Sequence, residues 1–182
     1  MKLNGLYESM RTIDDLGPYV ISIADIGEED GGGGISVAII HQKVIEYWND
    51  PENIDYNTRK PFVELDMPGR LAEADIENYG DYWTIHPTAH VKGWGPLVYE
   101  IGIEYATQNG KGLVPATAIS KLYGLPMSDT QQSANIWDKF YKRADVRHEV
   151  LTDIGPPYLY CVYTKPPEIL KQLEATGKLI KN

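Results

Sequence analysis

The part of the sequence that most narrows the choice of fold lies between residues 82 and 108, where a strand leads through a glycine-bearing turn into a helix. Tyr82–His86 is rich in aromatic and β-branched residues, which predicts a strand, and Pro87 is expected to end it. Pro96–Gln108 repeats apolar residues at helical spacing and is followed by Asn-Gly, which predicts a helix. A strand that leads directly into a helix predicts a sheet with helices packed against it.

The remaining segments extend this pattern on both sides. Strands are predicted at Tyr19–Ala24, Ile35–Ile40, Val44–Trp48, Phe62–Leu65 and Tyr158–Thr164, the second and third joined as a hairpin around His41–Lys43. Leu113–Val114 predicts the start of a short strand or a connector. Helical turns are predicted at Leu71–Asn78, a helix after the N-cap candidates Ser128–Thr130 as far as Arg143, and a C-terminal helix at Pro167–Leu179. Glu28–Gly34 predicts a solvated loop. The 182 residues predict one α/β or α+β domain over residues 1–182, with a strand-rich half at 1–80 and a cofactor-binding half at 81–182.

The composition excludes several classes of protein. No apolar run approaches about 18 residues, so a membrane-spanning helix is not expected. Cys161 is the single cysteine and cannot form an internal disulfide, which favours the reducing cytoplasm. The formal net charge of -9 argues against nucleic-acid binding by the whole surface. Residues 1–80 carry 16 acidic and 6 basic side chains, and residues 81–182 carry 10 and 11, so an anionic ligand meets less repulsion in the second half.

The turn His90–Leu97 has the physical features of an anion-binding site. The first backbone N–H groups of a helix lack partners within the helix, and the helix dipole favours negative charge there. Gly93 and Gly95 let the backbone approach a phosphate closely, and Lys92 adds a positive charge. The alternative is a tight connector between strand and helix that binds no ligand.

The same turn resembles the GNAT (GCN5-related N-acetyltransferase-like) superfamily. The pyrophosphate-binding turn of that family reads Gln/Arg-x-x-Gly-x-Gly/Ala between a strand and a helix, and His90-Val91-Lys92-Gly93-Trp94-Gly95 matches that pattern. A second family segment, Leu-Tyr-x-Lys-x-Gly-Phe, is matched by Phe140–Val146. The resemblance spans residues 82–164 and extends to acetyltransferase-like proteins of bacteriophages. His90, Pro96 and the pair Asp145-Val146 depart from the family pattern.

The resemblance implies a mixed, mostly antiparallel central sheet flanked by helices, and an enzyme that moves an acetyl or other acyl group from acetyl-CoA to an amine. It implies that the cofactor is bound by Thr84, Ile85, His86, His90, Val91, Lys92, Gly93, Trp94, Gly95, Pro96 and Leu97. A backbone N–H within Thr84–His86 would polarise the acyl carbonyl, and Tyr141 would protonate the departing thiolate. Glu64, Asp66 and His86 are the candidates for the general base, and a water molecule can take that role instead. No metal is expected.

Two other functions fit the same sequence. One is a catalytically inactive GNAT-like protein that binds a host protein, with the acidic first half facing a basic partner. The other is an enzyme that modifies a nucleic-acid base, because Lys139, Lys142, Arg143 and Arg147 form a basic run beside the tyrosine. The expected partners are acyl-CoA, an amine acceptor and a second copy of the chain paired through the C-terminal strand and helix. The expected location is the cytoplasm, and the host cytoplasm if the protein is encoded by a phage.

Several of these residues also have plain structural interpretations. Tyr141 fits a core tyrosine with a satisfied hydroxyl. Cys161 lies in an apolar strand and fits a buried, inert thiol. His86 and His90 have the spacing of a helical metal pair, but Pro87 and the preceding strand argue against helical geometry there.

Overall fold

The computed structural model describes residues 10–27, 33–50, 69–151 and 158–182. Within these residues one eight-stranded open sheet has the order β6-β7-β5-β4-β3-β2-β1-β8. The strands are β1 (Tyr19–Ile26), β2 (Gly34–His41), β3 (Arg70–Tyr79), β4 (Tyr82–Ala89), β5 (Gly112–Val114), β6 (Val146–Leu151), β7 (Tyr158–Tyr163) and β8 (Leu179–Lys181). Only the β4–β5 and β1–β8 pairs are parallel among the described strands. The protein therefore has the expected mixed, mostly antiparallel α/β sheet.

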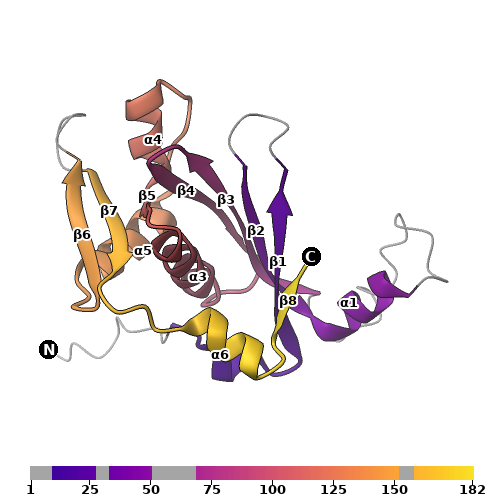
Figure 1. Ribbon diagram of the computed structural model, residues 1–182. Coiled ribbons are helices and arrows are strands. Elements are labelled where there is room, and N and C mark those ends of the chain that lie inside the picture. The colour runs from indigo at the N-terminus through magenta and orange to yellow at the C-terminus, as the bar shows by residue number, and fades with distance from the viewer. Residues whose placement is uncertain (1–9, 28–32, 51–68, 152–157) are drawn as a thin grey trace, which may run out of the picture.

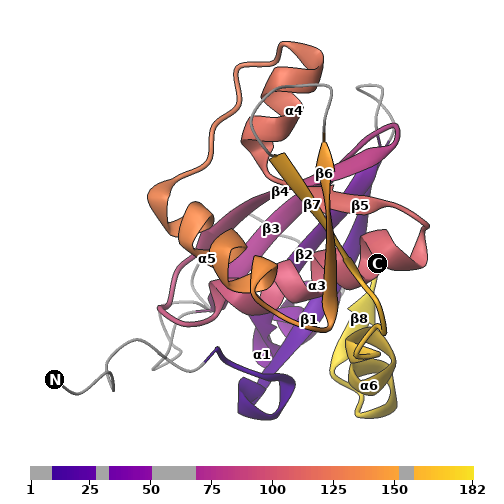
Figure 2. The ribbon, with the colours of Figure 1, turned by 90° about the vertical axis from the view of Figure 1, so that its left-hand side faces the viewer.

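Helices cover both faces of the sheet (Figures 1 and 2). They are η1 (Ile13–Leu16), α1 (Gln42–Asn49), α3 (Gly95–Gln108), α4 (Ala116–Tyr123), α5 (Gln131–Tyr141) and α6 (Ile169–Ala175). The main core joins one face of the sheet to η1, α3, α5 and α6. Two smaller clusters on the opposite face hold α1 and α4 at separate places. No described helix has the length and apolarity needed to cross a membrane.

Helix α3 lies close against the centre of the sheet because it carries a glycine at the contact. A Cβ at Gly102 would lie 3.0 Å from Ile76 Cδ1 and 3.3 Å from Leu113 Cδ2. Both neighbours are fully buried, so a larger side chain would force the helix away. The sequence predicted this helix correctly, since its apolar spacing and its Asn-Gly end are local signals.

Residues 71–78 form a strand, not the helical turns that were expected. The burial pattern alternates along β3, with Ala72, Ala74 and Ile76 in the main core. Alternation with a period of two residues defines a half-buried strand. The low β propensity of alanine and of the intervening acids concealed it in the sequence.

Residues 44–48 form part of helix α1, so the predicted strand and its hairpin at His41–Lys43 are wrong. His41 Nδ1 accepts a hydrogen bond from the Lys43 N–H at 3.2 Å and caps the helix. Val44 and Ile45 are buried against the sheet, and such adjacent positions can share one helix face. The hairpin partner of β2 is β1 instead. The predicted strand Phe62–Leu65 and most of the predicted loop Glu28–Gly34 lie outside the described residues.

The C-terminal segment crosses the molecule from one side of the sheet to the other. Figure 1 shows α6 running below α3, between β7 and β8. Glu104 of α3, which is fully buried, accepts hydrogen bonds from the N–H groups of Ile169 at 2.8 Å and Leu170 at 3.3 Å. Burial raises the pKa of Glu104, and these two N–H groups oppose that effect. The helix predicted at Pro167–Leu179 is shorter than expected, and β8 follows it.

Candidate functional site

The parallel pairing of β4 and β5 stops partway along β4. The register pairs Tyr82 with Gly112, Trp83 with Leu113 and Thr84 with Val114, after which β5 ends at Pro115. Strand β4 continues to Ala89, so Pro87 does not end it as expected. No described strand pairs with this last part of β4 on the side of β5. We call residues 85–89 on that side the open edge of β4.

The register decides which backbone groups face the open edge. Gly80 and Asp81 alone join β3 to β4, so the closing pair Tyr79–Tyr82 is hydrogen-bonded and the pairs then alternate. The His90 N–H donates to the Leu71 carbonyl at 3.0 Å, which fits this alternation. The N–H groups of Thr84 and His86 therefore point toward β3. Ile85, Pro87 and Ala89 are the residues whose backbone groups point toward the open edge.

Pro87 is tolerated inside β4 for this reason. A proline in a strand is accommodated where no ladder bond needs its N–H, and position 87 faces the open edge. The Ile85 N–H donates to the Val114 carbonyl in the last hydrogen bond between β4 and β5. The other pattern possible for the pair Thr84–Val114 would need an N–H at position 115, which is proline. The Val114 carbonyl also accepts from the Thr84 hydroxyl at 3.0 Å. No N–H of Thr84–His86 is thus left free at the open edge, which presents the carbonyl groups of Ile85 and Pro87 and, at its far end, the N–H of Ala89.

The turn before α3 retains only part of the expected set of free amides. The Val91 N–H donates to the Leu71 carbonyl at 3.0 Å, and the Leu97 N–H donates to the Trp94 carbonyl at 3.1 Å. Pro96 has no N–H to donate. The N–H groups of Gly93 and Gly95 have no acceptor among the described residues. Gly93 also has φ 94°, a conformation that favours glycine.

Arg11 lies against this turn, and the sequence analysis did not find it. Its N–H donates to the Gly93 carbonyl at 3.4 Å, and its guanidinium carbon lies 5.9 Å from the centre of the Trp94 ring. Trp94 is buried, whereas the Arg11 side chain is 48% exposed and forms an ion pair with Asp15 at 4.0 Å. A second cation therefore stands beside Lys92 at the start of α3. No local pattern in the sequence indicates a contact between segments so far apart.

His90 does not face the start of α3. Its Nε2 lies 3.0 Å from Glu73 Oε1, on the sheet face opposite α3. Burial alone would raise the pKa of Glu73, but the hydrogen bond with His90 and the charge of Arg70 lower it below its ordinary value. The His90 side chain therefore bonds to Glu73 and faces away from the start of α3.

Tyr141 lies in an aromatic cluster on α5. Its ring stacks on Trp137 at 6.1 Å and meets the His148 ring edge-on at 6.1 Å. Trp137 in turn meets Tyr99 of α3 at 5.3 Å, and Tyr99 bonds to Ser133 at 2.6 Å. Burial is the main cause that raises the pKa of Tyr141, so its hydroxyl stays protonated at neutral pH. Helix α5 also borders the turn, since a Cβ at Gly95 would lie 3.6 Å from Ala89 Cβ and 3.8 Å from Ile136 Cδ1.

His86 and Tyr141 lie on opposite sides of the sheet. Ile85 belongs to the main core with α3 and α5, so the neighbouring His86 side chain points to the other face. Its Nε2 lies 3.5 Å from Glu77 Oε2. The third expected catalytic residue, Glu64, and the alternative base Asp66 lie outside the described residues.

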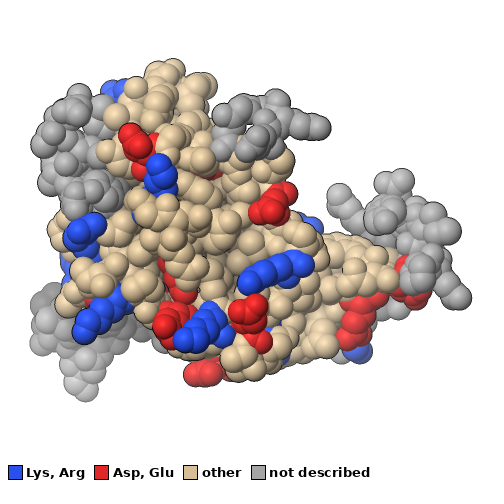
Figure 3. Space-filling model, in the orientation of Figure 1, with Lys and Arg blue, Asp and Glu red and all other residues tan. Residues whose placement is uncertain are grey.

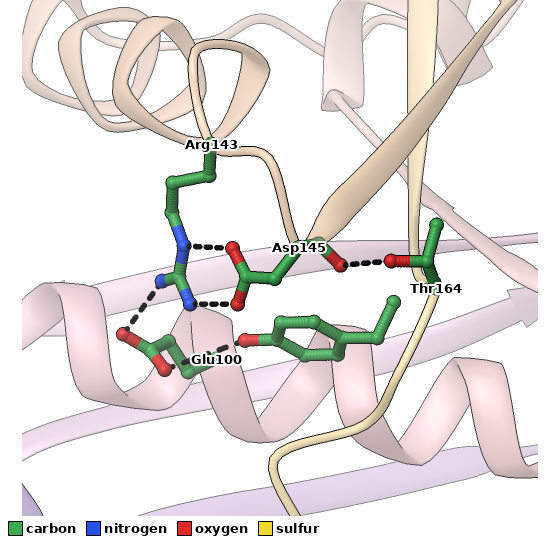
Figure 4. A network of polar contacts seen from close by, with 5 residues as sticks. Glu100, Arg143, Asp145 and Thr164 are labelled. Carbon is green, nitrogen blue, oxygen red and sulfur yellow. Dashed lines mark hydrogen bonds and ion pairs between the residues drawn. The ribbon is translucent and has the colours of Figure 1, made fainter.

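The basic run that begins near the end of α5 is partly neutralised by a network of polar contacts around Arg143 (Figure 4). Arg143 donates to both oxygens of Asp145, at 2.9 and 2.7 Å, and to Glu100 Oε1 at 3.0 Å. The Tyr163 hydroxyl donates to the other oxygen of Glu100 at 3.3 Å. The hydrogen bonds from Arg143 hold the pKa of Asp145 below its ordinary value of 3.8. Arg143 therefore joins α3 to the α5–β6 connection.

Cys161 is fully buried, and burial raises its pKa to about 12, so it remains a thiol at neutral pH.

No group of three or more His, Cys, Asp or Glu side chains is arranged to hold a metal ion within the residues that the structure describes.

Comparisons with protein-family models, with curated proteins and with solved structures found no match for this chain.

Proposed function

We propose that the protein is a GNAT-like N-acyltransferase that uses acyl-CoA. The observation that carries the proposal is the open edge of β4: a parallel strand pair, connected through α3, that separates after Thr84 while β4 runs on to the turn before the helix. The open edge and the start of α3 are adjacent along the chain. One extended ligand with an anionic end can therefore contact both.

The contacts available to acyl-CoA follow from this geometry. The pantetheine arm contains two amide N–H groups, and the carbonyl groups of Ile85 and Pro87 face the open edge as acceptors. The pyrophosphate would meet the Gly93 N–H, Lys92 and Arg11 at the start of α3. The positive charges and the N–H group together favour an anion over a neutral ligand.

The reaction balances without another reagent. The amine nitrogen attacks the thioester carbonyl carbon and forms the C–N bond, and the C–S bond then breaks with its electron pair going to sulfur. The amine loses one proton and the sulfur gains one. Tyr141, protonated at neutral pH, supplies the proton to sulfur, and His86 on the opposite sheet face receives the proton of the amine.

Calorimetric titration with acetyl-CoA and a thiol-release assay with an amine acceptor panel test this proposal. We expect saturable binding, turnover with at least one acceptor, and a decrease in kcat of about 100-fold or more for Tyr141→Phe. Tyr163→Phe is the matched control, since this buried tyrosine lies in the Arg143 network and should leave kcat within about twofold. Absence of binding at millimolar acetyl-CoA contradicts the proposal.

A second function, binding of a partner protein without catalysis, is favoured by one observation. The N–H groups of Val91 and Leu97 are already bonded within the chain, and Pro96 has none, which weakens an anion site. This alternative predicts that acetyl-CoA does not bind and that a host protein co-purifies with the chain in a fixed ratio. Saturable acetyl-CoA binding together with turnover would exclude it.

A further inference from the structure

The proposed reaction needs a hydrogen-bond donor at the acyl oxygen. Negative charge develops on that oxygen when the amine attacks, and a fixed donor must stabilise it. Thr84 and His86 direct their N–H groups to β3, Ile85 uses its own in the last rung to Val114, and Pro87 has none. The one N–H that the register turns to the open edge, that of Ala89, lies at the end next to the turn where the pyrophosphate is proposed to bind, so a side chain beside the edge is the candidate donor for the acyl oxygen.

The indole N–H of Trp137 is a hydrogen-bond donor on α5, the helix that borders the turn before α3. Its side chain is 3% exposed, and its indole Nε1 is buried with no hydrogen-bond partner among the described residues. A buried N–H without an acceptor is destabilising, so its presence needs an explanation. It lies on α5 directly after Ile136, whose side chain reaches the junction of Ala89 and Gly95 at the end of the open edge.

The position of Trp137 relative to Tyr141 fits a single thioester group. The two residues are one helical turn apart on α5, and their rings stack at 6.1 Å. The carbonyl oxygen and the sulfur of a thioester are bonded to the same carbon. One side chain can therefore meet the oxygen while its neighbour meets the sulfur.

We propose that the Trp137 indole N–H donates to the acyl oxygen of the thioester and stabilises the oxyanion; this rests on the proposed acyltransferase function. In the first step the amine electron pair forms the C–N bond, and the carbonyl π pair moves to oxygen, where the Trp137 N–H binds it. In the second step that pair re-forms the carbonyl, the C–S bond breaks, and Tyr141 protonates the sulfur. The indole keeps its proton throughout.

Trp137→Phe tests this role, because it removes the N–H and retains an aromatic ring. We expect kcat to fall about 100- to 1,000-fold, with little change in the affinity for acetyl-CoA. Trp83→Phe is the matched control, since Trp83 is also buried with an unpartnered Nε1 but lies beside Tyr105, at the other end of α3. A Trp137→Phe variant as active as the wild type overturns this inference and leaves the proposed function standing.

The indole N–H resonance of the wild-type protein gives a readout that needs no active variant. On ¹⁵N-labelled protein, the Trp137 signal should move downfield with acetyl-CoA and much less with CoA, which lacks the carbonyl. The Trp83 signal should not distinguish the two ligands. Equal responses of the Trp137 signal to acetyl-CoA and CoA overturn the inference, because the N–H then binds the tyrosine ring or another protein group. No binding of either ligand overturns the proposed function and this inference together.

Discussion

The sequence places Arg143 in a basic run that can meet an anionic ligand, but in the structure Arg143 joins two elements of the fold. A basic run beside a candidate catalytic tyrosine indicates an anion site when only the sequence is read. In the structure, the guanidinium is held by Glu100 and Asp145, which come from different elements (Figure 4). Asp145 is two positions from Arg143, but Glu100 is 43 positions away. The spacing of charges along the sequence therefore could not predict the pairing of Arg143 with Glu100.

Replacing Arg143 should therefore reduce stability. Arg143→Ala leaves the carboxylates of Glu100 and Asp145 without their cation, and we expect a loss of about 1–3 kcal/mol in the free energy of unfolding. Urea denaturation measures it, with the exposed Lys142→Ala on the same helix end as the control. Equal stability of the two variants would contradict the structural role.

The difference in unfolding free energy between the wild type and Arg143→Ala should depend on pH. The folded pKa of Asp145 lies below its ordinary value of 3.8 because Arg143 hydrogen-bonds to the carboxylate. A depressed folded pKa contributes stability that is complete above the unfolded pKa and is lost as the pH falls through the folded pKa. The difference in unfolding free energy between wild type and Arg143→Ala should thus be constant near neutral pH and shrink below about pH 3.8. A difference that persists unchanged at pH 2 would contradict this.

At the scale of elements, the helices with local signals were predicted and the strands with mixed signals were not. Helix α5 begins after Thr130, whose side chain accepts from the Ser133 N–H at 3.1 Å, as its N-cap pattern indicated. Strand β3 and helix α1 were predicted as the wrong kind of element, because tertiary packing decides between helix and strand there. No element was predicted at helix α4. The open edge of β4 could not be predicted either, because its register depends on where β5 ends.

Two proline substitutions test the register of β4. Pro87→Ala should change the free energy of unfolding by less than about 1 kcal/mol, because position 87 faces the open edge. Thr88→Pro should cost about 3 kcal/mol or more, because the Thr88 N–H points to β3 and the ring would break that ladder. Chemical denaturation of both variants measures the contrast. A large loss in Pro87→Ala with a small one in Thr88→Pro would reverse the assigned register.

At the scale of the whole molecule, the C-terminal segment connects β7 to the far strand β1 through α6 and β8. Lys178 donates to the Gly17 and Tyr19 carbonyl groups, and the Ile21 N–H donates to the Lys178 carbonyl at 2.8 Å. On the face that carries α6, positive and negative side chains are interspersed (Figure 3), so this face has no single sign. The segment is held at its start by the hydrogen bonds to buried Glu104 and at its end by the pairing of β8 with β1.

Glu104→Ala tests how this segment is held. The substitution leaves the Ile169 and Leu170 N–H groups without their acceptor, and we expect a loss of at least about 2 kcal/mol. Hydrogen exchange should show reduced protection of residues 169–175. The matched control is Glu174→Ala, whose carboxylate is 65% exposed and pairs with Lys181. Similar exchange rates in both variants would show that Glu104 does not hold the segment.

We propose that the open edge of β4 and the start of α3 together bind acyl-CoA. A crystal structure of the protein with bound CoA tests it most directly. We expect the pantetheine arm beside the carbonyl groups of Ile85 and Pro87, with the pyrophosphate at Gly93 and within reach of Arg11 and Lys92. Density for the nucleotide at another surface, with residues 85–89 uncovered, would contradict the account.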